Sequence, residues 1–176
     1  RNRTMKKILA IISIIVSSST IASAEGTYIG YGVARVAVSE PGYSYGSVNA
    51  IGLIGYDINP FFAIEAEMSF SLVKDTITIS STAIDLGVEH VAAFAKFTLP
   101  ESTSIKPYAR IGFVKAEASA TVGSTTVSVN DTALAYGIGA EFPISETSGI
   151  RIDYSGAEFS GNADGGVLAL TSVFRF

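Results

Sequence analysis

Eight charged residues occupy positions in the sequence from which their side chains could form ion pairs. In residues 55–70 (GYDINPFFAIEAEMSF), Glu65 and Glu67 fall on one side of a predicted strand, and the residues that alternate with them are apolar. Five later runs repeat this alternation of a charged face and an apolar face. The full set holds four acids and four bases: Glu65, Glu67, Lys96, Arg110, Glu141, Arg151, Asp153 and Arg175.

A sheet with one apolar face and one charged face fits two architectures. In a soluble sandwich the charges face water, whereas in a transmembrane barrel the apolar face meets lipid and the charges face the lumen. All eight charges lie within a few residues of the short turns predicted below, so a closed barrel would gather them in one layer. Isolated charges in a narrow interior are costly, and equal numbers of acids and bases allow pairing. This favours the barrel, and a soluble eight-stranded lipid carrier remains the alternative fold.

Catalysis and metal binding find little support in the residue types. The sequence holds one histidine, His90, without a serine-bearing nucleophile motif beside it, and no cysteine. The lack of cysteine excludes zinc–thiolate sites, cysteine nucleophiles and a disulfide framework. No carboxylates are grouped at the spacing of metal ligands. We therefore expect no enzymatic activity, no cofactor and no metal.

The first 24 residues have the pattern of a bacterial secretory signal peptide. Basic Lys6 and Lys7 precede the apolar run 8–16, and Ala22 and Ala24 form the small-residue site after which cleavage is expected. The apolar run is too short to span a bilayer as a helix, which needs about 20 residues. We expect residues 1–4 to be an over-extended N-terminus, residues 1–24 to be removed, and residues 25–176 to form a single barrel domain.

Removal of residues 1–24 leaves a strongly acidic chain. It takes away four of the 12 Lys and Arg residues and none of the 16 Asp and Glu residues, so the formal charge becomes −8. Such a charge argues against nucleic-acid binding. The mean hydropathy is high at +0.40, yet no segment of the mature part approaches 18 continuous apolar residues. Hydrophobicity spread through alternating strands is typical of a lipid-facing barrel.

The mature region divides into about eight strand-like runs separated by turn residues. We place them at 27–38, 46–57, 61–73, 84–99, 107–118, 131–143, 149–159 and 166–176. Short Pro-containing turns follow the second, fourth and sixth runs, and Gly-, Ser- or Thr-rich loops at 39–46, 74–83, 119–130 and 160–165 join the others. The predicted fold is therefore all-β, an eight-stranded antiparallel up-and-down transmembrane barrel. The second run is apolar on both sides, so its faces stay unassigned.

Several segments resemble the transmembrane domain of OmpA-type proteins. GYDINPFFAIEAEMSF resembles the second periplasmic-turn hairpin of those barrels, and VAAFAKFTLP, KPYARIGFV, YGIGAEFPI and GIRIDYS continue the similarity in order. The resemblance covers the whole mature chain and implies a bacterial outer-membrane location. It also implies that the terminal SVFRF, with Phe174 and Phe176, is the signal that the barrel assembly machinery recognises.

The resemblance further implies roles for the charged layer. In OmpA-type barrels a lumenal Glu exchanges partners between a Lys and an Arg, with a second Glu nearby. By position these match Glu65, Lys96, Arg151 and Glu141, and Arg110 falls on another lumenal basic position. We expect no peptidoglycan-binding domain after the eighth run, so the expected architecture is closer to the single-domain OmpX-like and Opa-like barrels.

Three classes of function remain open at this stage. The first is a structural, surface-exposed envelope protein, adhesive through its loops or without a specific partner there. The second is a narrow gated pore, although eight strands enclose an interior that side chains can fill. The third is a lipid-modifying enzyme, and His90 is the one residue that supports this alternative. The loops carry acidic residues without a binding motif: Glu40, Asp75, Asp131, Glu158 and Asp164.

The expected partners follow from the first class of function. They are outer-membrane lipid (lipopolysaccharide and phospholipid), the barrel assembly machinery through the C-terminal Phe, and a host or cell-surface ligand at the loops. We expect a monomer.

Overall fold

Eight antiparallel strands follow one another around a closed barrel in chain order, and β1 closes the barrel by pairing with β8. The computed structural model describes residues 26–40, 42–79, 81–99 and 104–176. Its elements are β1 (Thr27–Glu40), β2 (Tyr43–Asn59), β3 (Phe62–Ile79), β4 (Thr82–Thr98), β5 (Lys106–Val122), β6 (Thr125–Pro143), β7 (Ser148–Phe159), a short 3-10 helix η2 (Ser160–Asn162) and β8 (Ala163–Arg175). The predicted fold class is confirmed. The expected cleavage site at Ala22 and Ala24 lies outside the described residues.

The strands alternate between an apolar outer face and a buried inner face. On β6, the side chains of Leu134, Tyr136 and Ile138 are exposed, whereas Ala133 and Ala135, at the alternate positions, are buried. All strands contribute to this exposed apolar belt around the barrel, including β2, whose faces the sequence did not assign. On β2, Val48, Ile54 and Tyr56 point outward and Ile51 and Leu53 inward. In the described part of the chain, no helix is long and apolar enough to cross a membrane.

The hairpins at one end of the barrel are longer than the sequence predicted. Segments 39–46, 74–83 and 119–130, expected as loops, are almost wholly strand, and only residues 41–42, 80–81 and 123–124 separate the strands. Segments 74–83 and 119–130 are rich in β-branched Thr, Ile and Val, and 39–46 holds two Tyr; these residue types favour strands, and their preference outweighs the Ser and Gly content that indicated loops. As a correction, the loop residues Glu40, Asp75 and Asp164 lie in strands, as do Asp131 and Glu158, which stood at the loop ends of their predicted runs.

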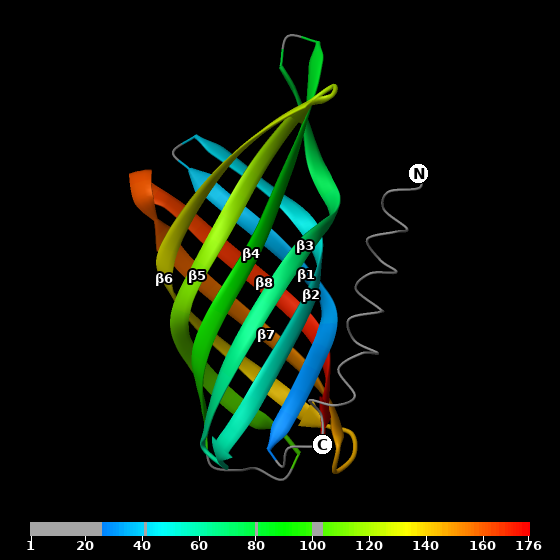
Figure 1. Ribbon diagram of the computed structural model, residues 1–176, viewed down its shortest axis with the longest axis vertical. Helices are drawn as coiled ribbons and strands as arrows, with labels where there is room; N and C mark the ends of the chain where they lie inside the picture. Colours follow the sequence, from blue (N-terminus) through cyan, green and yellow to red (C-terminus); the bar gives the residue numbers. More distant parts are fainter. Residues whose placement is uncertain (1–25, 41, 80, 100–103) are drawn as a thin grey trace.

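Two of these hairpins rise past the rest of the barrel as a four-stranded wall. β2 pairs with β3 only as far as Lys74, and β7 pairs with β6 only from Ala135, whereas the β3–β4 and β5–β6 hairpins stay paired to their tips. We call residues 75–79, 82–89, 115–122 and 125–134 the wall. Figure 1 shows its green β3–β4 and yellow β5–β6 hairpins standing above the β1–β2 and β7–β8 hairpins.

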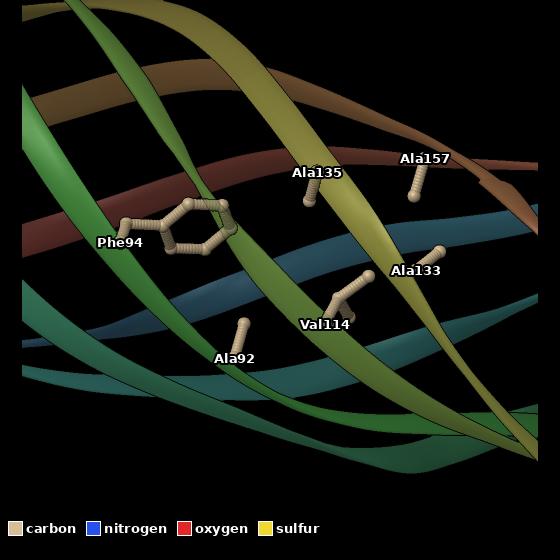
Figure 2. Close-up of a cluster of buried hydrophobic side chains, with 6 residues drawn as sticks. All are labelled: Ala92, Phe94, Val114, Ala133, Ala135 and Ala157. Atoms are coloured by element: carbon tan, nitrogen blue, oxygen red, sulfur yellow. The ribbon is translucent and has the colours of Figure 1, made fainter.

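The interior of the barrel is filled in two sections. The section nearer the wall is apolar and built mostly from small side chains, which point inward from β4 to β7 (Figure 2): Ala92, Phe94, Val114, Ala133, Ala135 and Ala157. The section nearer the opposite end, where β1 begins and β8 ends, is charged. We call this opposite end the terminal end. The two sections together leave the barrel with a core rather than a channel.

Candidate functional site

Glu65 is the centre of the charged section, and four strands supply its partners: β1, β4, β5 and β7. Arg151 on β7 donates two hydrogen bonds to the Glu65 carboxylate, at 2.6 and 2.9 Å, in a bidentate pair. The Tyr28 hydroxyl on β1 donates a third at 2.6 Å, and Lys96 on β4 lies 3.3 Å from the same oxygen. Glu65, Arg151 and Lys96 are at most 4% exposed. Such charges are tolerated inside a barrel only when they are paired.

A second acid, Glu67, is joined to the same section through Arg110. Arg110 Nη1 donates to Glu67 Oε2 at 2.6 Å and Arg110 Nη2 to Asp153 Oδ1 at 2.6 Å, while its Nε donates to the Ser155 hydroxyl at 2.9 Å. Asp153 also lies 3.4 Å from Arg151, which connects the two halves of the layer. These six groups, Glu65, Glu67, Asp153, Lys96, Arg110 and Arg151, hold three acids and three bases. The section is therefore formally neutral.

The two remaining predicted charges stand apart at the terminal end. Arg175 on β8 donates to both oxygens of Glu141, at 2.6 and 3.0 Å, and lies 3.7 Å from Asp57. They line an open cavity of about 550 Å³. The sequence predicted one layer of eight charges, and the structure places six in a buried cluster and Glu141 and Arg175 at the open mouth beside it.

Two inward tyrosines, which the sequence analysis missed, separate the mouth from the cluster. Lys96 Nζ lies 4.5 Å from the ring centre of Tyr28 and 5.7 Å from that of Tyr108, and the Arg151 Nε donates to the Tyr108 hydroxyl. A side chain at Gly55 would collide with the Tyr28 ring, so that glycine makes room for it. Tyr28 and Tyr108 share the strand parity of the inward charges, and this parity could have revealed them.

His90 has buried partners that were not foreseen from the sequence. Ser69 Oγ lies 2.8 Å from His90 Nδ1, and Glu67 Oε1 lies 3.0 Å from His90 Nε2. Because an ionised carboxylate only accepts, Nε2 carries a proton and donates to Glu67. Asn49 Nδ2 donates to Ser69 Oγ at 3.0 Å. The expectation that no serine accompanies His90 holds for the linear sequence but not in space, where β3 and β4 bring Ser69 and His90 side by side.

The apolar section fills the lumen on the wall side of the charged cluster. Phe94 marks the boundary, since its ring lies 4.3 Å from the Arg110 guanidinium carbon on one side and packs with Val114 and Ala135 on the other. The cavity that remains there, lined by Val36, Val88 and His90 among others, has about 30 Å³. That volume holds about one water molecule.

The two residues expected to carry the assembly signal lie at the terminal end. Phe174 is stacked on Tyr31, with ring centres 5.6 Å apart, and Phe176 is exposed. Both lie where the apolar outer belt ends at the terminal end of the barrel, and their role in assembly stays a prediction.

Comparisons with known proteins agree with this architecture. The model of the family described as "Outer membrane protein beta-barrel domain" matches residues 8–176. None of the curated proteins matches the sequence. Among solved structures, Ail, the attachment invasion locus protein of Yersinia pestis, superposes with a TM-score of 0.65 at 20% identity, over 87% of this chain and 100% of that one.

Two further solved barrels are similar. Neisserial surface protein A (NspA) gives a TM-score of 0.69 at 19% identity, over 86% of this chain and 98% of its own. The N-terminal β-barrel domain of Pseudomonas aeruginosa OprF gives 0.54 at 11% identity, over 85% of this chain and 98% of its own. At these identities the likeness concerns the fold.

Proposed function

We propose that this chain, which belongs to the outer membrane protein beta-barrel domain family, is a surface protein that uses its barrel as an anchor and its wall for contact outside the cell. Its location is the bacterial outer membrane, which is the location of the family. The observation that carries the proposal is the wall, which extends the β3–β4 and β5–β6 hairpins past the apolar belt. A rigid scaffold that presents such segments is the usual place for binding function. Ail, named for attachment and invasion, and NspA, named a surface protein, support it.

The other partners proposed from the sequence follow from the same placement. The exposed apolar belt contacts outer-membrane phospholipid and lipopolysaccharide, and Phe174 and Phe176 are offered to the barrel assembly machinery at the terminal end. One barrel suffices for each of these contacts, so the proposed unit is a monomer without cofactor or nucleic acid.

The alternative of a narrow pore is opposed by the apolar section. Exchange of Glu65 from Arg151 to Lys96 would rearrange the charged cluster alone, while Ala92, Val114 and Ala135 would still exclude water beyond Phe94. We expect planar-bilayer recordings of the folded chain to show no steady current, and Lys96→Met, which removes one partner of Glu65, to leave the recordings unchanged. A current that appears or changes with Lys96→Met would revive the gated pore.

A catalytic role for His90 is not proposed. Ser69, His90 and Glu67 are at most 5% exposed, and no lipid ester has access to a hydroxyl enclosed in this way. Their hydrogen bonds instead satisfy polar groups that the interior would otherwise leave unpaired.

The contact function is tested by trimming the wall. The chain is expressed in a bacterium that does not adhere to cultured cells, with β3–β4 and β5–β6 both shortened to the level of the other two hairpins. We expect the full chain to confer adherence. Adherence of cells with the trimmed chain should fall to background, because the barrel alone presents no protruding hairpins outside the cell. As a control, replacing the turn Gly123-Ser124 by Asn-Gly keeps the wall and should keep adherence.

Outer-membrane fractions and gel mobility before and after boiling establish that each variant is inserted and folded. Adherence that survives trimming in folded protein would refute the proposed function.

A further inference from the structure

The cavity at the terminal end has no role in the proposed contact function. It holds about 550 Å³, which is within the range of small-molecule sites in proteins, and it opens at the mouth of the barrel. Buried Tyr108 lines it on the inner side, and the Tyr108 hydroxyl accepts a hydrogen bond from Arg151 in the charged cluster. A ligand that enters the cavity therefore meets a closed floor and stays at the mouth.

The four charges that line the cavity alternate in sign around the mouth. In strand order they are Asp57 on β2, Lys106 on β5, Glu141 on β6 and Arg175 on β8. Glu141 and Arg175 are committed to each other, since the guanidinium donates to both carboxylate oxygens at 2.6 and 3.0 Å. This pair leaves Asp57 and Lys106 as the charges available to a ligand.

Asp57 and Lys106 are each poorly paired within the chain. Asp57 Oδ2 lies 3.7 Å from Arg175 Nε, which is beyond hydrogen-bond distance, and 32% of the Asp57 side chain is exposed. Lys106 is directly opposite Glu141 in the β5–β6 ladder, yet its ammonium group has no ion-pair partner among the residues that the structure describes. The two groups can therefore accept a new partner each, a cation at Asp57 and an anion at Lys106.

Apolar side chains occupy the arc between these two charges. β3 and β4 separate β2 from β5, and there the cavity is lined by Pro60 and Phe61 in the β2–β3 turn and by Leu99 just after β4. Phe61 and Leu99 are 56% and 57% exposed. The Phe61 backbone N–H donates to Asn59 Oδ1 at 2.9 Å, which holds the turn. The rim thus presents an acid, an apolar stretch and a base, in that order.

We propose that this mouth binds a short peptide with free amino and carboxyl ends. Its ammonium group lies beside Asp57, its carboxylate lies beside Lys106, and its apolar side chains contact Phe61 and Leu99. A simple anion such as phosphate would use Lys106 and neither of the other two features. The site goes beyond the contact function because it lies at the opposite end of the barrel from the wall. With the wall outside the cell, the mouth faces the periplasm, so the peptide comes from that compartment.

The experiment measures peptide binding to the folded chain in phospholipid nanodiscs, which leave both ends of the barrel accessible, by isothermal titration calorimetry. Peptides of two to four residues that alternate Ala and Leu are prepared with both ends free, with the amino end acetylated, or with the carboxyl end amidated. Each block removes one charge and keeps the apolar side chains. We expect one length to bind best with both ends free. Each block should weaken it by about fivefold, as for an ion pair partly exposed to solvent.

Two variants assign each end of the peptide to its residue. In Lys106→Met, amidation should no longer matter while acetylation still weakens binding, and in Asp57→Asn the reverse should hold. A general loss of folding or of cavity shape would not produce this crossed pattern. Lys115→Met is the matched control, because Lys115 lies further along the same strand on its outer face. That variant should bind all three forms as the unchanged chain does.

Four results would overturn the site. Binding that neither block weakens would show apolar adsorption only, and displacement of the peptide by an equal concentration of inorganic phosphate would show a simple anion site. An undiminished effect of amidation in Lys106→Met would separate the carboxylate from Lys106. No measurable binding of any peptide at millimolar concentration would also refute the proposal. None of these results bears on the contact function, since the wall is intact in every variant.

Discussion

Replacing Glu65 by alanine is expected to lower the free energy of unfolding of the barrel by about 3–5 kcal/mol. The Glu65 carboxylate accepts from Arg151 and Tyr28 and lies 3.3 Å from Lys96. Its removal leaves Asp153 as the one acid beside Arg151 and leaves Lys96 against two tyrosine rings, both cations still buried. An unpaired buried charge is costlier than the net value of the pair that held it. Urea unfolding of protein folded into phospholipid vesicles, followed by far-UV circular dichroism, measures the loss.

Two further variants separate charge balance from packing. Glu117→Ala removes an exposed acid on the outer face of β5 and should change stability by no more than about 0.5 kcal/mol. Glu65→Ala combined with Lys96→Met removes one acid and one base together, so the cluster is neutral again and part of the loss should be recovered. A double variant that is less stable than the sum of the single effects would contradict the view that charge balance governs this cluster.

The sidedness of the strands was predictable because the side-chain period of a strand is two residues. Glu65 alternates with apolar residues on its strand, and Arg151 and Asp153 do the same on theirs. The two-residue period therefore placed all three inward, and all three are buried. The rule also reaches Tyr28 and Tyr108, which the sequence analysis did not single out. Parity is a property of the backbone and holds whatever the side chain is.

The choice of partners was not predictable to the same extent. Glu141 and Arg151 are directly opposite in the β6–β7 ladder, yet Glu141 receives both of its hydrogen bonds from Arg175, on the strand beyond. Contacts across the lumen depend on the stagger between strands and on the length of each side chain. Glu65 and Arg151, separated by 86 residues in sequence, meet for this reason.

The prediction of the hairpin lengths was wrong for a different reason. In TTVSVNDT, small polar residues resemble a loop, but Val and Thr recur at alternate positions as on a solvent-exposed strand. Outside the lipid, both faces of such a strand tolerate hydroxyl groups, so the polarity contrast that marks the membrane strands vanishes. The wall could be found only from the strand register.

Placing an arginine on the outer belt at Ile138 is expected to destabilise the barrel in a bilayer by about 2–4 kcal/mol. Ile138 is 69% exposed and lies in the middle of the apolar outer face of β6, between Tyr136 and Phe142. In a soluble protein, a charge at so exposed a position would change stability little, since it would remain in water. Here the guanidinium must reach the headgroups or draw water into the hydrocarbon, and both cost free energy. The measurement is again urea unfolding in phospholipid vesicles.

Thr132→Arg is the matched control for this change because it lies on the same strand and the same face. Thr132 is opposite Lys115 in the β5–β6 ladder, at a level where the outer face already carries a cation. The cost of arginine falls to about 0–1 kcal/mol near the membrane interface, so Thr132→Arg should be nearly neutral. The difference between the two variants then measures depth in the bilayer rather than the tolerance of β6 for arginine. If both were equally tolerated, the apolar belt would not be the surface that faces lipid, and the wall above it would lose its place outside the membrane.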